Sequence, residues 1–312
     1  MQPRIIFMGT PEFAVPALAI LVENGYDVVA VVTATDKWGG RGGKKLLESA
    51  VKQYAVAHQI PVLQPSNLKA PAFLEELQNF RADLQIVVAF RMLPKVVWAM
   101  PALGTFNLHG SLLPRYRGAA PINWAVINGD EETGVTTFFI QEEIDTGDLI
   151  FQEKMPIFPT DTAGNVHDKM MILGAQTVLK TVRAIVAGEV VTQRQDNELA
   201  TPAPKLTPEN TRINFHQSTE QVHNLIRGLS PFPAAWTTLD GEKWKILRSK
   251  PLQEKHNLQP GTIVSDGKTF FNIATPDGFI EVQELQVPGK RRMAVSDFLN
   301  GWRSAPEAQA FQ

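Results

Sequence analysis

The sequence predicts an α/β protein: a domain built on a mostly parallel β-sheet, followed by a small C-terminal β-barrel. Through the first 188 residues, short apolar runs rich in Val and Ile alternate with longer stretches of helical periodicity. That rhythm is typical of β-α-β units. After Gly188, short runs with closely spaced turn signals prevail instead, as in small barrels. The 312 residues are enough for two domains of ordinary size.

The first half of the chain supplies the parallel sheet. We expect buried strands where short β-branched runs lie between turn signals, and helices where apolar residues recur every three or four positions. The expected strands are 4–8, 27–33, 62–63, 84–89, 104–109, 133–140 and 149–157. The expected helices are 13–24, 45–58, 71–79, 94–98 and 163–187. Such a Rossmann-like sheet carries helices on both faces and binds ligands at the carboxyl ends of its strands.

The second half predicts a linker, one helix and an OB-like barrel. Residues 197–208 contain three prolines and little periodicity, and a helix is expected at 219–228. From Trp236 onward, Gly follows Asp or Pro at five turn positions, which indicates short antiparallel strands. We therefore divide the chain into a first domain at 1–188, a linker at 189–208 and a β-barrel domain at 209–312.

Composition narrows the class of protein. The chain has no cysteine, which excludes disulfides, Cys-based zinc sites and a thiol nucleophile and suits a reducing compartment. Because its net charge is −2, the chain as a whole does not attract nucleic acid, and any nucleic-acid binding would depend on a local basic patch. The longest apolar runs are far shorter than the ~20 residues of a membrane span, and the N-terminus lacks the apolar core of a signal peptide. We expect a monomeric cytoplasmic protein that binds no membrane.

Two glycine-rich stretches fall where nucleotide-binding motifs occur, and neither fits. The residues at 9–12 follow the first strand without a G-x-G-x-x-G pattern. The run G-G-R-G-G-K-K at 39–45 resembles a phosphate-binding loop, but that motif requires glycine where Trp38 stands and Ser or Thr where Lys45 stands. The six histidines are dispersed without H-E-x-x-H, so no catalytic metal is expected.

The polar residues that suit catalysis follow the strand at 104–109. Asn107 and His109 alternate with Leu108, so their side chains project from one face of that strand. An amide donor beside an imidazole suits the stabilisation of an oxyanion and a proton transfer, both of which acyl transfer requires. The loop I-D-T-G-D at 144–148 can bring Asp145 to the imidazole. Taken alone, His109 also fits a hydrogen-bonded histidine at a strand end, and Asp145 fits a turn-forming residue.

Together these segments form a long signature. The run N-L-H-G-S-L-L-P at 107–114, continued by Y-R-G-A-A-P-I and followed by E-T-G-V-T and D-T-G-D, resembles the 10-formyltetrahydrofolate-dependent formyltransferases, and among them the branch that formylates methionyl-tRNA. The resemblance spans nearly the whole chain. It implies a catalytic trio of Asn107, His109 and Asp145. It also implies a tetrahydrofolate-contacting segment of Ser111, Leu112, Leu113 and Pro114.

The resemblance further implies the reaction and shows one departure. The free amine of initiator methionyl-tRNA would attack the formyl carbon of 10-formyltetrahydrofolate, the co-substrate, without an acyl-enzyme. Asn107 and a protonated His109 would stabilise the oxyanion, and Asp145 would hold His109 and help to move the proton. In 90–94, where the family lines the pterin pocket, Arg91 stands in place of a frequent glycine, and no side-chain role follows for it.

Two regions of positive charge favour tRNA as the acceptor. The loop at 38–45 joins Trp38 to Arg41, Lys44 and Lys45, which we expect to contact the tRNA; a solvated loop without a partner would look the same. Residues 205–312 hold 13 Lys and Arg against 11 Asp and Glu, whereas residues 1–204 hold 17 against 21. Basic clusters at 243–250 and 290–292 suit a phosphate backbone, although ordinary solvated strands and turns also explain them. Trp236 and Trp244 are expected in the barrel core.

Two other functions share part of this pattern. A formyltransferase for an amino-sugar nucleotide has the same core and a similar C-terminal fold. A non-catalytic folate- or RNA-binding module is disfavoured, because it would not need competent residues at all three catalytic positions. An assay of methionyl-tRNA formylation in vitro distinguishes a formyltransferase that acts on methionyl-tRNA from one that acts on an amino-sugar nucleotide. Folate binding without transfer would support the non-catalytic module.

Overall fold

A computed structural model describes residues 2–39, 43–302 and 310–311 of the chain. The chain divides into two compact units, the first made of Met1–Gly118, Thr133–Pro156 and His167–Pro202, and the second of Ala119–Glu132, Ile157–Val166 and Ala203–Gln312. Residues 189–202, which we expected in a linker, belong to the first unit. The domain boundaries 1–188, 189–208 and 209–312 stay a prediction.

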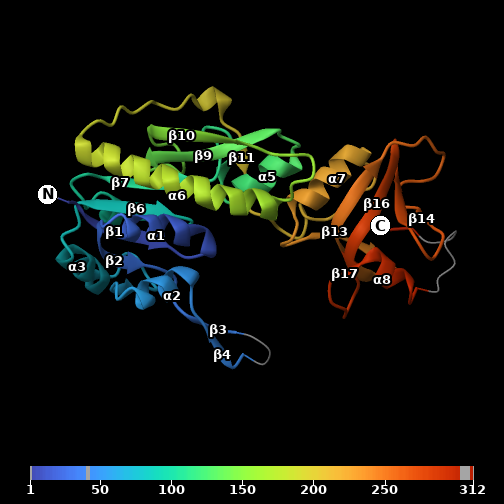
Figure 1. Cartoon of the computed structure of the whole chain (residues 1–312), viewed down its shortest axis with the longest axis horizontal. Coiled ribbons are helices and arrows are strands. Elements are labelled where there is room, and N and C mark those ends of the chain that lie inside the picture. Colours follow the sequence, from blue (N-terminus) through green and yellow to red (C-terminus); the bar gives the residue numbers. More distant parts are fainter. Residues whose placement is uncertain (1, 40–42, 303–309, 312) are drawn as a thin grey trace. The chain divides into compact units, whose positions relative to one another are not determined.

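The first unit is built on a seven-stranded sheet in the order β10-β9-β7-β6-β1-β2-β5 (Figure 1). Its strands are β1 (Arg4–Gly9), β2 (Asp27–Val32), β5 (Val62–Leu63), β6 (Leu84–Val88), β7 (Thr105–His109), β9 (Glu132–Phe139) and β10 (Leu149–Pro156). From β7 to β5 neighbouring strands are parallel, while β9 is antiparallel to β7. The predicted Rossmann-like, mostly parallel α/β sheet is therefore confirmed.

Helices cover both faces of this sheet. They are η1 (Glu12–Ala14), α1 (Val15–Glu23), α2 (Ala50–Ala57), α3 (Pro71–Asn79), α4 (Lys95–Trp98) and α6 (Ala163–Ala187), with η2 (Asn197–Leu199) farther along the chain. Helices α3 and α4 pack on one face, in a cluster with apolar residues of β1, β2 and β6. On the other face α6 meets Leu108, which lies so close to Gly174 that a side chain there would collide with it. Asn107 and His109 alternate with Leu108, so they project from the face opposite α6.

Helix α6 is long and apolar enough to cross a membrane by length and composition, with a hydropathy of 1.4 over its most apolar window. Half of that window is buried inside the protein. Met170, Val178 and Val182 are fully buried, and Thr181 exchanges a hydrogen bond of 2.8 Å with Thr137 of β9. These contacts make α6 a core helix of the first unit.

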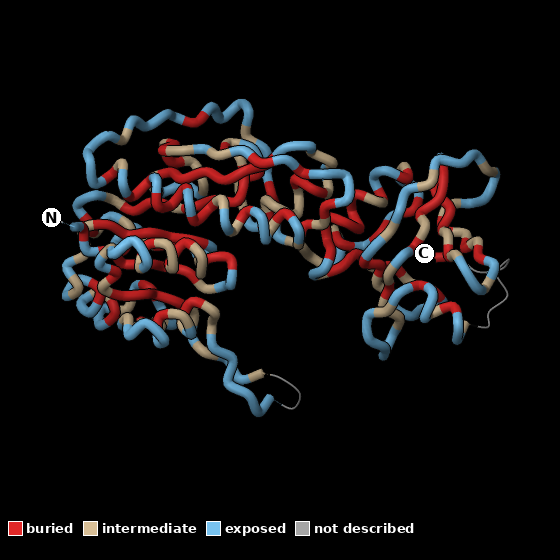
Figure 2. Tube along the Cα trace, in the orientation of Figure 1, coloured by how far each residue is buried: buried red, intermediate tan, exposed pale blue. Residues whose placement is uncertain are grey.

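Residues 37–39 and 45–49 differ from the expected loop and helix. The helix expected at 45–58 begins only at Ala50, because Ser49 caps it by accepting a hydrogen bond from the Lys52 amide at 3.0 Å. Before the cap, β4 (Lys45–Leu47) pairs with β3 (Lys37–Gly39) in an antiparallel hairpin. The hairpin stands apart from the large sheet (Figure 1) and is mostly exposed (Figure 2).

The second unit is a curled antiparallel sheet in the order β12-β13-β16-β15-β14, with β17 paired to β16. Two register shifts bend β13 against β16, and the resulting half-barrel confirms the predicted barrel-like fold. The strands are β12 (Ala235–Leu239), β13 (Glu242–Leu252), β14 (Ile263–Ser265), β15 (Phe271–Thr275), β16 (Gly278–Gln286) and β17 (Met293–Ala294). The helices of this unit are α5 (Pro121–Ile127), α7 (Thr219–Gly228) and α8 (Val295–Leu299); two short strands elsewhere are β8 (Arg117–Gly118) and β11 (Pro202–Ala203).

Candidate active site

His109 is the centre of the site and is almost entirely buried, with 7% of its side chain exposed. Its Nε2 lies 2.8 Å from the carbonyl oxygen of Tyr116. A carbonyl oxygen only accepts, so Nε2 carries a hydrogen and donates it. The other ring nitrogen, Nδ1, lies 3.7 Å from Oδ2 of Asp145, which is longer than a hydrogen bond. Nδ1 is therefore the ring nitrogen that can turn to a reacting group.

Asp145 reaches His109 from the loop between β9 and β10. Because β9 runs antiparallel to β7, this loop starts beside the first residue of β7, where Ile140 donates to the carbonyl of Thr105 at 2.8 Å, and then folds back to His109. The backbone of Asp145 has a φ of +56°, in the left-handed region. This conformation is energetically unfavourable for a residue that carries a side chain. Its Oδ2 accepts a hydrogen bond of 2.9 Å from the Gly118 amide.

Gly147 explains the glycine of the D-T-G-D motif. A β-carbon at this position would lie 1.7 Å from the carbonyl oxygen of Phe139. Only glycine permits so close an approach of the loop to β9, and that approach positions the preceding residues of the loop.

Asn107 lies two residues before His109, about 7 Å along the strand. It is half-buried and sits between Val87 of β6 and Phe138 of β9. Its amide projects from the same face as His109. The structure thus brings the three predicted catalytic residues to one face of β7.

The predicted folate-contacting segment turns sharply after β7. The hydroxyl of Ser111, which is fully buried, donates to the carbonyl of Arg115 at 2.6 Å. Leu113 packs in a cluster with Phe138 and Leu149. Only Leu112 and Pro114 are partly exposed. The first and third residues of the segment therefore shape the turn, and its role toward folate stays a prediction.

Arg91 has a structural partner. Its guanidinium donates to the carbonyl of Ser66 at 3.0 Å and also to that of Pro65. It thereby joins the loop after β6 to the loop after β5. The next residue, Met92, has 73% of its surface exposed.

The hairpin of β3 and β4 carries the residues expected to contact tRNA. Lys44 and Lys45 are exposed, and Arg41 lies outside the described residues. Trp38 is 72% exposed and faces Leu46, 42% exposed, across the hairpin. An exposed aromatic residue beside lysines suits contact with unpaired nucleotides.

The base of this hairpin is held by charged groups. Lys52 of α2 binds Asp36 and lies 2.8 Å from Oε1 of Glu48. Gln64 adds a hydrogen bond of 2.8 Å to Asp36. The hydrogen bonds from Lys52 and Gln64 lower the pKa of Asp36, and those to Asp36 and Glu48 raise the pKa of Lys52. Both groups thus keep their charge over a wide pH range.

In the second unit, the expectation for Trp236 is wrong and that for Trp244 is correct. Trp244 packs against Phe298 and Phe311 with ring centroids 5.4 and 5.6 Å away. Buried and partly exposed residues alternate along β12, and Trp236 falls on the outer face. Lys243 lies 4.0 Å and Arg212 5.5 Å from the centroid of the Trp236 ring, distances at which a cation is attracted to the face of the indole.

The comparisons with known proteins agree with these observations. A family model described as "Formyl transferase" matches residues 3–182, and one described as "Formyl transferase, C-terminal domain" matches residues 205–303. The chain belongs to the formyl transferase family.

Relatives within this family match nearly the whole chain. A methionyl-tRNA formyltransferase of Bacteroides fragilis is 55% identical over 309 residues, covering 96% of this chain and 95% of the relative. One of Flavobacterium johnsoniae is 53% identical over 314 residues, covering 99% of each. An N-formyltransferase from Helicobacter canadensis, solved with folinic acid and dTDP-3-aminofucose, shares the fold with a TM-score of 0.69. It is 24% identical and covers 90% of this chain and 98% of that one.

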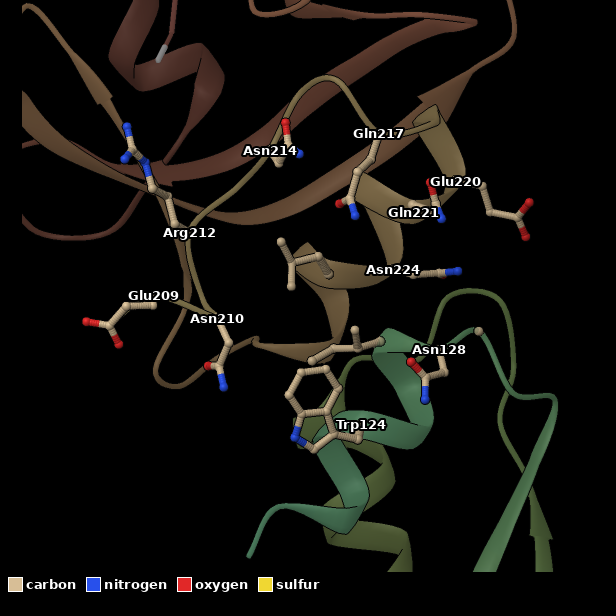
Figure 3. Close-up of a pocket in the computed structure, with 13 residues that line it drawn as sticks. Trp124, Asn128, Glu209, Asn210, Arg212, Asn214, Gln217, Glu220, Gln221 and Asn224 are labelled. Carbon is tan, nitrogen blue, oxygen red and sulfur yellow. The ribbon is translucent and has the colours of Figure 1, made fainter. Parts of the chain in front are cut away.

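This member of the formyl transferase family also has a polar cavity of about 630 Å³ in its second unit, beside α5 and α7 (Figure 3). Three of the side-chain amides that line it already have partners within this unit. Asn210 accepts from the Thr207 amide at 2.8 Å, Gln221 completes the capping box of α7, and Asn224 accepts from the Arg227 side chain at 2.7 Å. These three amides therefore need no ligand to satisfy them.

Among the described residues, no group of three or more His, Asp and Glu side chains is arranged to hold a metal ion. Sequence reasoning missed one residue at the active site, Gln195. It is buried and contacts the loop of Asp145, but it stands in a polar stretch without a motif.

Proposed function

We propose that this chain transfers the formyl group of 10-formyltetrahydrofolate to the α-amino group of initiator methionyl-tRNA, in the cytoplasm and as a preparation for translation initiation. The observation that carries the proposal is the 55% identity, over 96% of the chain, to a methionyl-tRNA formyltransferase. Competent residues at all three positions of the proposed trio support catalysis rather than binding alone.

The proposed chemistry is a direct transfer in which atoms and charges balance. The methionine amine forms a bond to the formyl carbon and gives a tetrahedral oxyanion. The bond from that carbon to N10 of the folate then breaks, and N10 takes up the proton that the amine has lost. No enzyme-bound acyl group is formed, which agrees with a chain that has no cysteine.

Each residue of the trio has a proposed task in this transfer. The amide of Asn107 and the Nδ1 hydrogen of protonated His109 donate to the oxyanion, each interaction contributing about 3 kcal/mol. The contact of Nε2 with the Tyr116 carbonyl keeps the ring oriented. The Asp145 carboxylate, 3.7 Å from Nδ1, stabilises the charged ring and relays the amine proton toward N10.

We further propose how the two substrates are held. Ser111, Leu112, Leu113 and Pro114 form one wall of the folate site, the first and third by shaping the turn. Lys44 and Lys45 of the hairpin, together with Arg41, contact the acceptor end of the tRNA, and Trp38 stacks on a base. Residues 209–312 hold the tRNA backbone through their basic clusters. The chain does this as a monomer.

The test is a pair of transfer assays with 10-formyltetrahydrofolate as donor. One supplies initiator methionyl-tRNA and the other a dTDP-linked amino sugar, and formylated product is measured by mass spectrometry. We expect formylmethionyl-tRNA and no formylated sugar. Formylation of the sugar alone would establish the alternative acceptor, and folate binding without either product would leave a binding module.

A further inference from the structure

Asp145 occupies a strained position that other parts of the chain must hold. Its φ of +56° lies in the left-handed region, and 12% of its side chain is exposed. The approach of Gly147 to Phe139 secures one end of the loop. The backbone at Asp145 itself is secured by a residue 50 positions later in the chain.

That residue is Gln195, which is 6% exposed. Its side-chain amide donates to the carbonyl of Asp145 at 2.9 Å and to the carbonyl of Gly147 at 2.8 Å. Both amide hydrogens are thus used on the loop of Asp145. Without the Gln195 amide, the carbonyls of Asp145 and Gly147 would lose a hydrogen-bond donor, which is unfavourable in a buried site. The loop would then move so that these carbonyls find other donors.

The oxygen of the same amide is held by Arg117. Its guanidinium donates to Oε1 of Gln195 from Nε at 3.1 Å and from Nη2 at 2.7 Å, and Nη2 also donates to Asn197 at 2.8 Å. The Arg117 amide donates to the carbonyl of Thr201 at 2.9 Å. Only this orientation of the Gln195 amide pairs every donor with an acceptor.

Arg117 leads back to the carboxylate of Asp145. The next residue, Gly118, donates its amide hydrogen to Oδ2 of Asp145 at 2.9 Å. One continuous network therefore holds Asp145 twice, by its carbonyl through Gln195 and by its carboxylate through Gly118. Arg117 connects the two points.

From this geometry we propose that Gln195 and Arg117 are positioning residues for the reaction, which set the place of the Asp145 carboxylate beside His109. The inference rests on the proposed function, in which Asp145 acts on His109 and on the amine proton. It assigns a role in catalysis to two side chains, Gln195 and Arg117, which supply no atom that reacts.

The test is a double-mutant cycle between Gln195 and Asp145. Gln195→Met keeps the length of the side chain but removes all four hydrogen bonds. We expect kcat to fall about 10- to 50-fold, because a displacement near 1 Å costs up to about 100-fold, while KM for each substrate stays within about twofold. In an Asp145→Asn background, where the carboxylate no longer acts, the same change is expected to cost less than about threefold.

Two further variants complete the design. Gln193→Met alters an exposed side chain of the same segment and is expected to leave kcat unchanged. Arg117→Lys keeps the charge but loses the paired donation, and we expect a kcat loss of about 3- to 10-fold that also disappears in the Asp145→Asn background. It replaces Gln195→Met if that protein does not fold.

Each outcome is decisive. An equal loss in the wild-type and Asp145→Asn backgrounds, or no loss at all from either variant, would overturn the positioning role. If Asp145→Asn alone keeps the wild-type kcat, the proposed catalytic trio fails, and the positioning role fails with it. A rise in KM for tRNA at unchanged kcat would mean that the segment binds substrate instead.

Discussion

The face of β7 and the β3–β4 hairpin are built in opposite ways. At β7 two of the proposed catalytic groups are largely buried and held by hydrogen bonds: His109 by Tyr116, and Asp145 by Gly118 and Gln195. On the hairpin, Trp38, Lys44 and Lys45 are exposed, and the fixed contacts lie at its base. Transfer of a one-carbon group requires atoms held within a fraction of an ångström, whereas contact with an RNA end requires reach and adaptable charge. The contrast predicts that damage at β7 lowers kcat and damage on the hairpin raises KM for tRNA.

The largest effect is expected from the residues that project from β7. Asn107→Ala and His109→Ala each remove a proposed donor to the oxyanion and should lower kcat at least about 100-fold. Steady-state kinetics with both substrates measures this loss. His216→Ala, which alters an exposed histidine, is the matched control and should keep the wild-type kcat. Full activity in either β7 variant would remove that residue from the mechanism.

Trp38→Ala should give the next largest effect. Stacking of a base on an aromatic side chain contributes about 1–3 kcal/mol, so KM for tRNA should rise by roughly fivefold or more. The values of kcat and of KM for the folate should stay as they are. Trp38→Phe, which keeps a stacking surface, should recover most of the affinity. If Trp38→Ala binds tRNA with the affinity of the wild type, the indole does not contact the tRNA.

A smaller effect is expected from the hairpin lysines. Lys44→Ala and Lys45→Ala each remove one phosphate contact in the proposed arrangement, so KM for tRNA should rise a few-fold. The slope of log affinity against log salt should become shallower by about 1 for each variant. Lys268→Ala, an exposed lysine outside the two basic clusters, serves as the control. If the slope of log affinity against log salt is unchanged in both hairpin variants, neither lysine contacts the tRNA.

The smallest effect is expected at the base of the hairpin. Lys52→Ala removes the cation that holds Asp36 and Glu48 together, and the hairpin would then sample more orientations. KM for tRNA should rise about two- to threefold with kcat unchanged, because ion pairs close to the solvent are weak. Lys52→Arg should restore the wild-type KM. A larger loss in kcat than in KM would show that this base acts on the reaction site.

The sequence was sufficient for much of this molecule. Apolar runs and helical periodicity predicted the seven strands of the large sheet and the long helix α6, because burial imposes those patterns directly. The alternation of Asn107, Leu108 and His109 predicted which side chains share a face. The motif with Asp145 predicted which carboxylate meets the imidazole.

The parts that could not be predicted depend on contacts between distant segments. The run at 45–47 reads as part of a helix, but the Ser49 cap and the pairing with β3 make it a strand. Trp236 is apolar, yet its register with the outer face of β12 places it under two cations. Gln195 acts through hydrogen bonds that join residues 50 positions apart. Neither the composition of the chain nor the spacing of its motifs indicates such a contact.

The proposed separation of tRNA binding at the hairpin from chemistry at β7 is tested most directly by single-turnover formyl transfer from 10-formyltetrahydrofolate to initiator methionyl-tRNA. The rate is measured at rising tRNA concentration for the wild type, Trp38→Ala and Asn107→Ala. We expect the wild type to formylate the tRNA, and Trp38→Ala to need more tRNA but to reach the same maximal rate. Asn107→Ala should stay at least about 100-fold slower at saturation. No transfer by the wild type would contradict the proposed function. A Trp38→Ala rate that stays low at saturating tRNA would contradict the separation of binding at the hairpin from chemistry at β7.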